Sequence, residues 1–250
     1  MKKVLVLNGS PKKEESTTML VTNNFLKGLE STGEYKSETI HVSALNVKPC
    51  KGCLCCWGRT NGKCVIQGDD VQMVKDKILE ADVIILSFPI FIFGLPGELK
   101  VLMDRLLSLL HRYEGLPVPE KGPFHGFSFD QSKKKFIVIP GCAWSDWRIF
   151  APIEMQFDCL FGKGEYTTIF APQIRTAIAM KIRPRFVKFL TKYEAAGREF
   201  AENGCLSEET KANVIKPYYS DAVYKQLVDS FWEIEDGAYR ESLEKKEKQG

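Results

Sequence analysis

Five of the eight cysteines in this 250-residue chain lie within one short segment, residues 50–64. Four of them, Cys50, Cys53, Cys56 and Cys64, follow the spacing C-x2-C-x2-C-x7-C, and Cys55 is extra. Four thiolates at such spacing are a candidate ligand set for a [4Fe–4S] cluster. Two other interpretations stay open: zinc binding, although zinc sites built from four cysteines usually space their pairs more widely, and reduced or reactive thiols without a metal. Each interpretation makes the segment a candidate redox or metal site.

A second motif overlaps the cysteine segment. Cys53, Arg59 and Thr60 match the C-x5-R-[ST] pattern of protein tyrosine phosphatases. That chemistry requires a cysteine at the end of a strand and a helix after the arginine, so that N–H groups and the helix dipole lower the thiol pKa. Pro49 precedes the segment here and an Asn-Gly pair ends it, and neither a strand nor a helix is predicted. The phosphatase alternative is therefore disfavoured.

The first twenty residues hold a candidate phosphate site. An apolar run at residues 4–7 stops at Asn8 and Gly9, and a helical pattern starts near Ser16. Between them lie hydroxyl side chains and backbone N–H groups beside the positive end of a helix dipole, where a phosphate can bind. The loop lacks both the G-x-G-x-x-G and the P-loop patterns. The alternative is an ordinary strand-to-helix turn in which Ser16 only caps the helix.

A strongly apolar loop, residues 87–97, follows another predicted strand. It carries Phe91, Ile92 and Phe93 where the chain should reach the ligand edge of a sheet, and such a loop suits a flat aromatic ring. The alternative is burial under C-terminal helices or at a subunit interface. A third loop, residues 140–147, brings Gly141 and two tryptophans to the same edge.

These loops need a scaffold that brings strand ends together. Several of the predicted strands are continuous apolar runs, which are typical of a sheet covered on both faces. The predicted strands are residues 4–7, 38–42, 83–88, 136–139 and 167–171. Helical patterns alternate with them, starting near Ser16 and after Asp70, over residues 98–112 and over residues 149–160. The order indicates an α/β fold with a doubly wound, five-stranded parallel sheet.

The helix expected over residues 98–112 is the most clearly amphipathic one. Leu99 and Leu102 lie on its apolar face, and Asp104 and Ser108 on its polar face. Beyond residue 178 only helical patterns occur, so residues 179–250 are predicted to form a C-terminal helical extension that packs on the core or lies at an oligomer interface.

Composition excludes several classes of function. The 35 basic and 32 acidic side chains leave a net charge of +3, which argues against a nucleic-acid partner. No apolar stretch is long enough to span a membrane and no signal peptide is recognised, so a cytoplasmic protein is expected. The isolated cysteines, Cys142, Cys159 and Cys205, are expected to be small buried apolar residues.

Four motifs occur in order along about the first 175 residues. They are LNGSP at residues 7–11, the Cys50 to Cys53 element, GKC with two aspartates at residues 62–70, and the apolar loop followed by Leu99-Lys100 and Asp104-Arg105. Together they resemble the NADPH-dependent FMN reductase family of flavodoxin-like proteins, and within it the iron–sulfur flavoproteins. The resemblance implies a flavodoxin-like strand order of 2-1-3-4-5 and non-covalent FMN bound by a domain of residues 1–178.

The resemblance also implies three groups of FMN contacts. The phosphate group would lie among Ser10, Lys12, Ser16, Thr17 and Thr18. The isoalloxazine ring would lie between two further sets: Pro89, Ile90, Phe91, Ile92, Phe93 and Gly94 on one side, and Gly141, Cys142 and Ala143 on the other. Two departures from the family are visible. Many relatives carry a tyrosine or tryptophan where this chain has Phe91 to Phe93, and their last cysteine gap is five residues rather than seven.

Conventional catalytic groups are scarce, and each of the three histidines is interpreted as structural or solvated. FMN itself supplies redox chemistry, so the protein need only bind and orient it. We therefore expect an NAD(P)H oxidoreductase that passes electrons through FMN to a quinone, a flavin, a nitro or azo compound, or a redox protein. The alternative is an electron carrier without small-molecule turnover. A homodimer or homotetramer is expected from the resemblance and from the apolar loop.

Overall fold

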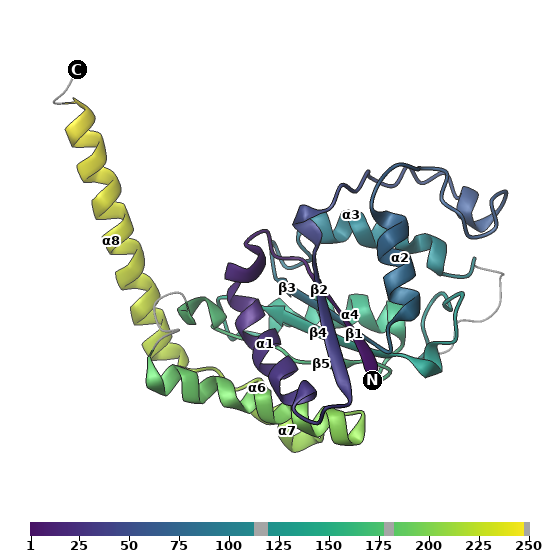
Figure 1. The fold of residues 1–250 in the computed structure, drawn as a ribbon. Helices are drawn as coiled ribbons and strands as arrows, with labels where there is room; N and C mark the ends of the chain where they lie inside the picture. The colour runs from purple at the N-terminus through teal and green to yellow at the C-terminus, as the bar shows by residue number, and fades with distance from the viewer. Residues whose placement is uncertain (113–119, 178–182, 248–250) are drawn as a thin grey trace. The chain divides into compact units, whose positions relative to one another are not determined.

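The computed structural model describes residues 1–112, 120–177 and 183–247 (Figure 1). Its centre is a five-stranded sheet in the order β2-β1-β3-β4-β5, with every neighbouring pair parallel. The strands are β1 (Lys2–Asn8), β2 (Tyr35–His41), β3 (Val83–Pro89), β4 (Lys135–Gly141) and β5 (Thr167–Thr168). The predicted α/β class and flavodoxin-like strand order are confirmed.

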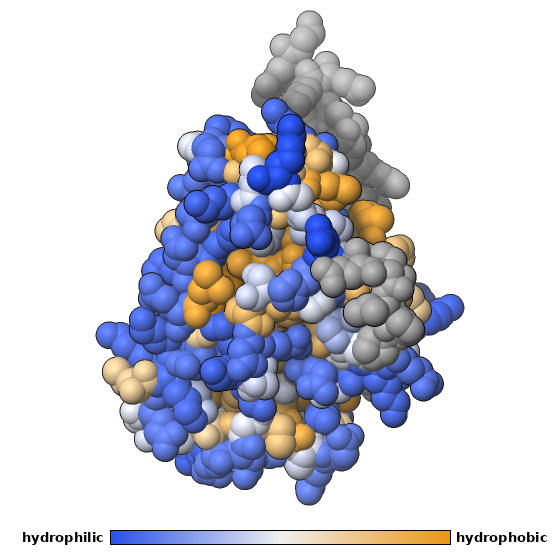
Figure 2. All heavy atoms as spheres, turned by 90° about the vertical axis from the view of Figure 1, so that its right-hand side faces the viewer, coloured by the Kyte–Doolittle hydropathy of each residue, from blue (hydrophilic) through white to orange (hydrophobic). Residues whose placement is uncertain are grey.

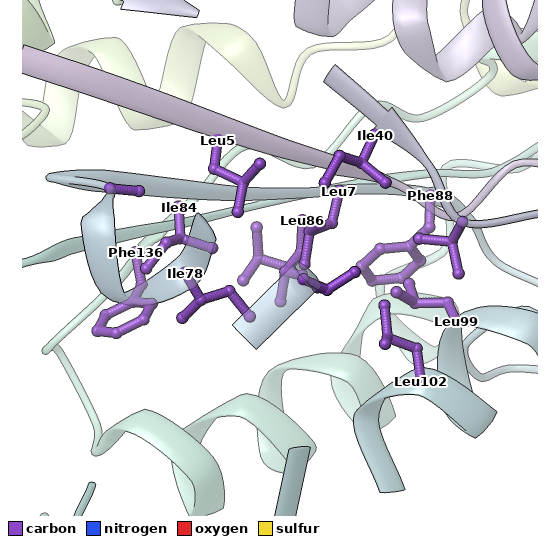
Figure 3. Close-up of a cluster of buried hydrophobic side chains, with 14 of the residues drawn as sticks. Leu5, Leu7, Ile40, Ile78, Ile84, Leu86, Phe88, Leu99, Leu102 and Phe136 are labelled. Carbon is purple, nitrogen blue, oxygen red and sulfur yellow. The ribbon is translucent and has the colours of Figure 1, made fainter. Parts of the chain in front are cut away.

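Helices cover both faces of the sheet (Figure 1). The helices of the described residues are α1 (Thr17–Glu30), α2 (Val71–Glu80), α3 (Gly97–Arg105), α4 (Trp147–Phe161), α6 (Pro184–Asn203), α7 (Glu208–Val214) and α8 (Asp221–Glu247), of which α8 belongs to a separate compact unit. Alternate residues of β1 and β3, such as Leu5 and Ile84, pack against α2, α3 and α4 in one apolar core (Figure 3). The helix α1 contacts β2, β3 and β4 on the other face. Both faces are thus buried, as the continuous apolar strands predict.

Helix α6 packs along α1 through two glycines. A Cβ added at Gly28 would lie 1.8 Å from the Glu194 carbonyl oxygen, and one added at Gly197 would lie 1.9 Å from the Phe25 carbonyl oxygen. The two backbones therefore touch where these glycines meet. The chain divides into two compact units, residues 1–216 and 217–250. The first unit includes α6 and α7 together with the sheet, so its boundary lies beyond the residue 178 at which the sequence pattern changes.

Three sequence expectations differ from the structure. The helix over 98–112 ends as an α-helix at Arg105 and continues as a 3-10 helix, η4 (Leu106–Leu109), so Ser108 turns inward and is buried. Strand β5 has two residues instead of five. Cys142 is buried as expected, but Cys159 and Cys205 are exposed.

No helix among the described residues is long and apolar enough to cross a membrane. On the face drawn in Figure 2, apolar side chains form small patches between hydrophilic ones.

Candidate functional site

A cleft opens at the carboxyl ends of β1, β3 and β4, where three loops meet. It encloses about 770 Å³, part of which is open to solvent. Its lining residues are Ser10, Pro11, Lys12, Ser16, Thr17, Thr18, Pro89, Ile90, Phe91, Gly141, Cys142, Ala143, Ile174 and Arg175. This is the edge at which parallel α/β sheets bind ligands.

Hydroxyl groups gather at one end of the cleft, between β1 and α1. The Asn8 side chain shapes this loop, because its Oδ1 accepts from the Ser10 N–H at 2.9 Å and its Nδ2 donates to the Lys13 carbonyl at 3.0 Å. Ser16 makes no side-chain capping bond to α1. The Thr18 Oγ1 is buried and has no hydrogen-bond partner in the described part of the chain. A buried hydroxyl without a partner is unfavourable, and a ligand oxygen in the cleft would satisfy it.

Two apolar loop segments, residues 89–91 and 141–143, line the other end of the cleft. The Ile90 N–H donates to the Gly141 carbonyl at 2.8 Å, and the Cys142 N–H donates to the Ala171 carbonyl at 3.1 Å. These bonds join the loops after β3, β4 and β5. At Gly141 an added Cβ would lie 2.6 Å from Thr18 Oγ1, so any larger residue would narrow the cleft.

The thiol of Cys142 is held in its neutral form. Burial raises its pKa to about 11, and its Sγ donates to the Trp144 carbonyl at 2.7 Å. A neutral thiol is a poor nucleophile at physiological pH. Cys142 therefore contributes shape to the cleft wall rather than reactivity.

Most of the predicted contact residues line this cleft. Three do not: Ile92, Phe93 and Gly94 lie in a tight turn outside the lining set. Three lining residues were missed from the sequence, namely Pro11, Ile174 and Arg175. Ile174 and Arg175 follow β5, and only the sheet order places the end of β5 beside that of β4.

The cysteines lie in a separate loop whose two ends are joined. We name residues 47–69 the cysteine loop. The Asn46 N–H donates to Asp70 Oδ2 at 2.7 Å, and the Asp70 N–H donates to the Asn46 carbonyl at 2.9 Å. The Asp70 carboxylate thus closes the loop and makes no side-chain capping bond to α2. Trp57 fastens the loop to η4 and to the residue after it, because its Nε1 donates to the Leu107 carbonyl at 3.2 Å and to the Leu110 carbonyl at 2.9 Å.

A buried arginine lies behind the ends of the cysteine loop. Arg105 Nη1 donates to the Lys48 carbonyl at 2.7 Å, and its Nη2 donates to the Ile66 carbonyl at 3.2 Å. It thus bonds to both arms of the loop. Asp69 completes the arrangement as the ion-pair partner of Arg105.

The thiols themselves do not converge. Within the ranges that the structure describes, no three His, Cys, Asp or Glu side chains are arranged to hold a metal ion. Arg59 Nη2 donates to Cys55 Sγ at 3.0 Å, so the arginine of the phosphatase-like motif contacts Cys55. Cys50, Cys53, Cys56 and Cys64 thus have the chemistry of a cluster ligand set but not its arrangement.

Comparison with known proteins gives the family. The profile of the NADPH-dependent FMN reductase family matches residues 2–135, more than half of the chain. The chain belongs to this FMN reductase family. Most of the cleft and the whole cysteine loop fall within the matched residues, whereas the loops after β4 and β5 follow them.

Curated iron–sulfur flavoproteins are similar to part of the chain. One from Methanocaldococcus jannaschii is 40% identical over 103 residues, which cover 41% of this chain and 51% of the relative. Another from Clostridioides difficile is 31% identical over 109 residues, which cover 44% and 48%. The matches thus span about half the length of these relatives.

Solved structures support the fold of the family member. An FMN-dependent NADH-azoreductase from Bacillus anthracis, solved with FMN, aligns with a TM-score of 0.54 and 21% identity over 80% of this chain and 100% of its own. An NAD(P)H:quinone oxidoreductase from Methanothermobacter marburgensis aligns with a TM-score of 0.54 and 17% identity, covering 79% and 95%. At these identities the likeness concerns the fold.

Proposed function

We propose that the cleft binds FMN and that the protein uses it to transfer electrons from NAD(P)H to a second acceptor. The observation that carries this proposal is the buried Thr18 Oγ1, which lacks a partner within the described residues and lines a cleft at the ligand edge of the sheet. Family membership, and the FMN-bound azoreductase of the same fold, support the choice of ligand.

The residues of the cleft suit the two ends of FMN. Ser10, Ser16, Thr17 and Thr18 offer hydroxyls, and α1 begins there with backbone N–H groups that favour an anion. Ile90 and Gly141 offer apolar walls and close backbone approach for a flat ring. FMN, when bound, supplies hydride acceptance from a nicotinamide and return of one or two electrons. The chain's own residues then bind the phosphate, orient the ring and exclude water along one side.

The experiment is spectroscopy followed by turnover. The purified protein, or protein reconstituted with FMN, should show a bound-flavin spectrum and should oxidise NAD(P)H when a quinone is added. A protein that takes up no FMN would disprove the proposal. A protein that binds FMN but turns over no small acceptor would be an electron carrier.

The cysteine loop favours that carrier as a second candidate. Relatives that match part of this chain are named iron–sulfur flavoproteins, and the cysteine loop carries four thiols at the spacing C-x2-C-x2-C-x7-C. The loop would have to rearrange before Cys50, Cys53, Cys56 and Cys64 held a cluster, because the described thiols do not converge. Iron and acid-labile sulfide analysis after anaerobic purification tests whether the loop holds a cluster.

Self-association as a homodimer or homotetramer stays a prediction, tested by light scattering.

A further inference from the structure

One buried amide side chain, that of Asn8 at the end of β1, shapes the loop between β1 and α1. Its Oδ1 accepts a hydrogen bond from the Ser10 N–H at 2.9 Å, and its Nδ2 donates to the Lys13 carbonyl at 3.0 Å. A backbone N–H only donates and a carbonyl only accepts, so these two bonds fix which end of the amide is oxygen and which is nitrogen. One hydrogen of Nδ2 is left for another acceptor.

A histidine on the neighbouring strand accepts that hydrogen. Asn8 and His41 are partners in the parallel register of β1 and β2, and Asn8 Nδ2 lies 2.9 Å from His41 Nδ1. Because the amide nitrogen only donates, Nδ1 must be the acceptor and carries no proton. The proton of the neutral imidazole then lies on Nε2, which donates to Glu14 Oε1 at 2.6 Å. The Nε2–H tautomer therefore satisfies every bond of the network.

These bonds connect His41, which lies outside the cleft lining, to the hydroxyl end of the cleft. Ser10 lines the cleft. Lys13 has a φ of 50°, which residues other than glycine rarely adopt. The Asn8 side chain bonds to both residues, so the backbone of the loop depends on the orientation of this amide. That orientation in turn requires an acceptor at His41 Nδ1, because a buried N–H without a partner is unfavourable.

We propose that His41 is a positioning residue for the cleft, whose unprotonated Nδ1 keeps Asn8 in the orientation that FMN binding requires. This inference rests on the proposed function and adds a residue that controls cofactor affinity without contacting the cofactor. A second proton on the imidazole would place a donor at Nδ1, opposite the donating Asn8 Nδ2. The amide would then have to turn over, and its bonds to Ser10 and Lys13 would be lost.

The charged groups at this network belong to the 3-10 helix η1 (Lys13–Glu15). The Glu14 carboxylate contacts the imidazole and attracts a second proton to it, whereas Lys13 carries the opposite charge. The Glu14 side chain is 78% exposed, so water weakens its attraction. The buried Asn8 amide opposes the second proton through a direct hydrogen bond. Histidines change charge between about pH 5 and pH 8, so acidification should break the network.

Nuclear magnetic resonance tests the arrangement without FMN. Long-range proton–nitrogen correlation spectra distinguish the two neutral tautomers of histidine, and the signals that disappear in His41→Asn belong to His41. In the FMN-free protein at about pH 7.5, His41 should carry its proton on Nε2 and none on Nδ1. The opposite tautomer would overturn the inference.

Fluorescence titration then measures the dissociation constant (Kd) for FMN in two variants. His41→Leu removes the acceptor, so the loop should relax and Kd should rise about tenfold at about pH 7.5. His41→Asn offers a carbonyl oxygen in place of Nδ1 and should stay within about threefold of wild type. The matched control is His111→Asn, which should leave Kd unchanged because His111 is exposed and outside the cleft lining.

The pH profile of Kd separates positioning from packing. A phosphate monoester such as FMN gains a proton at about pH 6, and this affects every variant alike. Between about pH 7.5 and pH 5.5, the Kd of wild type should rise about tenfold more than that of His41→Asn, which has no imidazole to protonate. If His41→Leu does not fold, these two profiles decide the question.

The outcomes distinguish this inference from the function on which it rests. FMN binding that is equal in wild type and His41→Leu would refute the inference and keep the proposed function. Equal losses in His41→Leu and His41→Asn, or parallel pH profiles of wild type and His41→Asn, would also overturn it, because His41 would then act only by packing. Protein that takes up no FMN at any pH would refute both.

Discussion

Arg105 Nη1 and Asp69 Oδ2 lie 2.5 Å apart, and both side chains are almost completely excluded from solvent. The pair joins the end of α3 to the residues just before α2. Through the Lys48 and Ile66 carbonyls, the same guanidinium also fixes both arms of the cysteine loop. One buried cation thus links two helices and the loop between β2 and α2.

Breaking this pair should destabilise the protein strongly. Arg105→Met and Asp69→Asn should each lower the free energy of unfolding by about 3–5 kcal/mol, because each leaves a buried group without its partner. The double variant Arg105→Met/Asp69→Leu should recover part of the loss. Urea denaturation measures these values. The matched control is Lys100→Met, which breaks the exposed Lys100–Asp104 pair of α3 and should change stability by less than about 1 kcal/mol.

The contribution of Asp69 should also depend on pH. Burial alone would raise its pKa, but hydrogen bonds from Arg105 and the Lys48 N–H, with the arginine charge, lower the pKa below the ordinary 3.8. A lowered carboxyl pKa stabilises the folded state above the unfolded value, and this stabilisation is lost as the pH falls through the folded value. The stability gap between wild type and Asp69→Asn should therefore shrink below about pH 3.8. A gap that stays constant as the pH falls well below that value would contradict the assignment.

Thr18→Val should affect the affinity for FMN without lowering the stability of the FMN-free protein. Valine keeps the shape but removes the buried hydroxyl that has no described partner. The FMN-free protein should be as stable as wild type or more so, while the affinity for FMN should fall about tenfold or more. Calorimetry on the FMN-free protein and fluorescence titration with FMN measure the two effects. Equal FMN affinity in both proteins would show that Thr18 does not contact the phosphate.

Cys142 should resist alkylation until strongly alkaline pH. Its pKa of about 11 arises from burial, so the reactive thiolate is scarce at neutral pH and appears only as the pH approaches that value. Mass spectrometry after brief iodoacetamide treatment at about pH 8 should find Cys159 and Cys205, which are exposed, modified before Cys142. Rapid modification of Cys142 under the same conditions would show that the loop after β4 opens readily.

Gly197→Ala should disturb the contact between α1 and α6. The added methyl group would lie 1.9 Å from the Phe25 carbonyl oxygen, so one helix backbone must move. We expect a loss of about 3 kcal/mol in the free energy of unfolding. Gly237→Ala in α8 is the control, because nothing lies within 4 Å of its added methyl group and alanine favours a helix there. Similar stabilities for the two variants would contradict the contact.

The sequence predicted the strands of the sheet better than it predicted which polar side chains are buried. Continuous apolar runs located the central strands β1, β3 and β4, because strands buried on both faces require them, whereas the edge strands β2 and β5 have more polar sequences. Ser108 was misplaced because the helix changes from α to 3-10 geometry after Arg105, which alters the residue spacing on each face. Arg105 was named only as part of a family motif, and its burial was not predicted, because its partners lie far away in sequence.

The candidate cleft was predicted in part for similar reasons. The loop positions follow from the strand ends, so residues such as Ser10 and Pro89 were found. Ile92 and Phe93 were assigned to the ring because an apolar loop suggests a continuous wall, whereas the backbone closes into a two-residue turn. Arg175 follows a strand of only two residues, too short for a periodic signal to extend beyond it.

Because the ends of the cysteine loop are joined, its length can change without a large effect on the fold. Asn46 and Asp70 bond to each other, so the sheet and α2 meet the same two residues whatever lies between them. Lengthening a loop that is already closed adds little entropy cost, since each doubling of length costs only about 0.6 kcal/mol. Residues can therefore be gained or lost between the cysteines over evolution without altering the fold. The seven-residue gap before Cys64 is a change that this architecture tolerates.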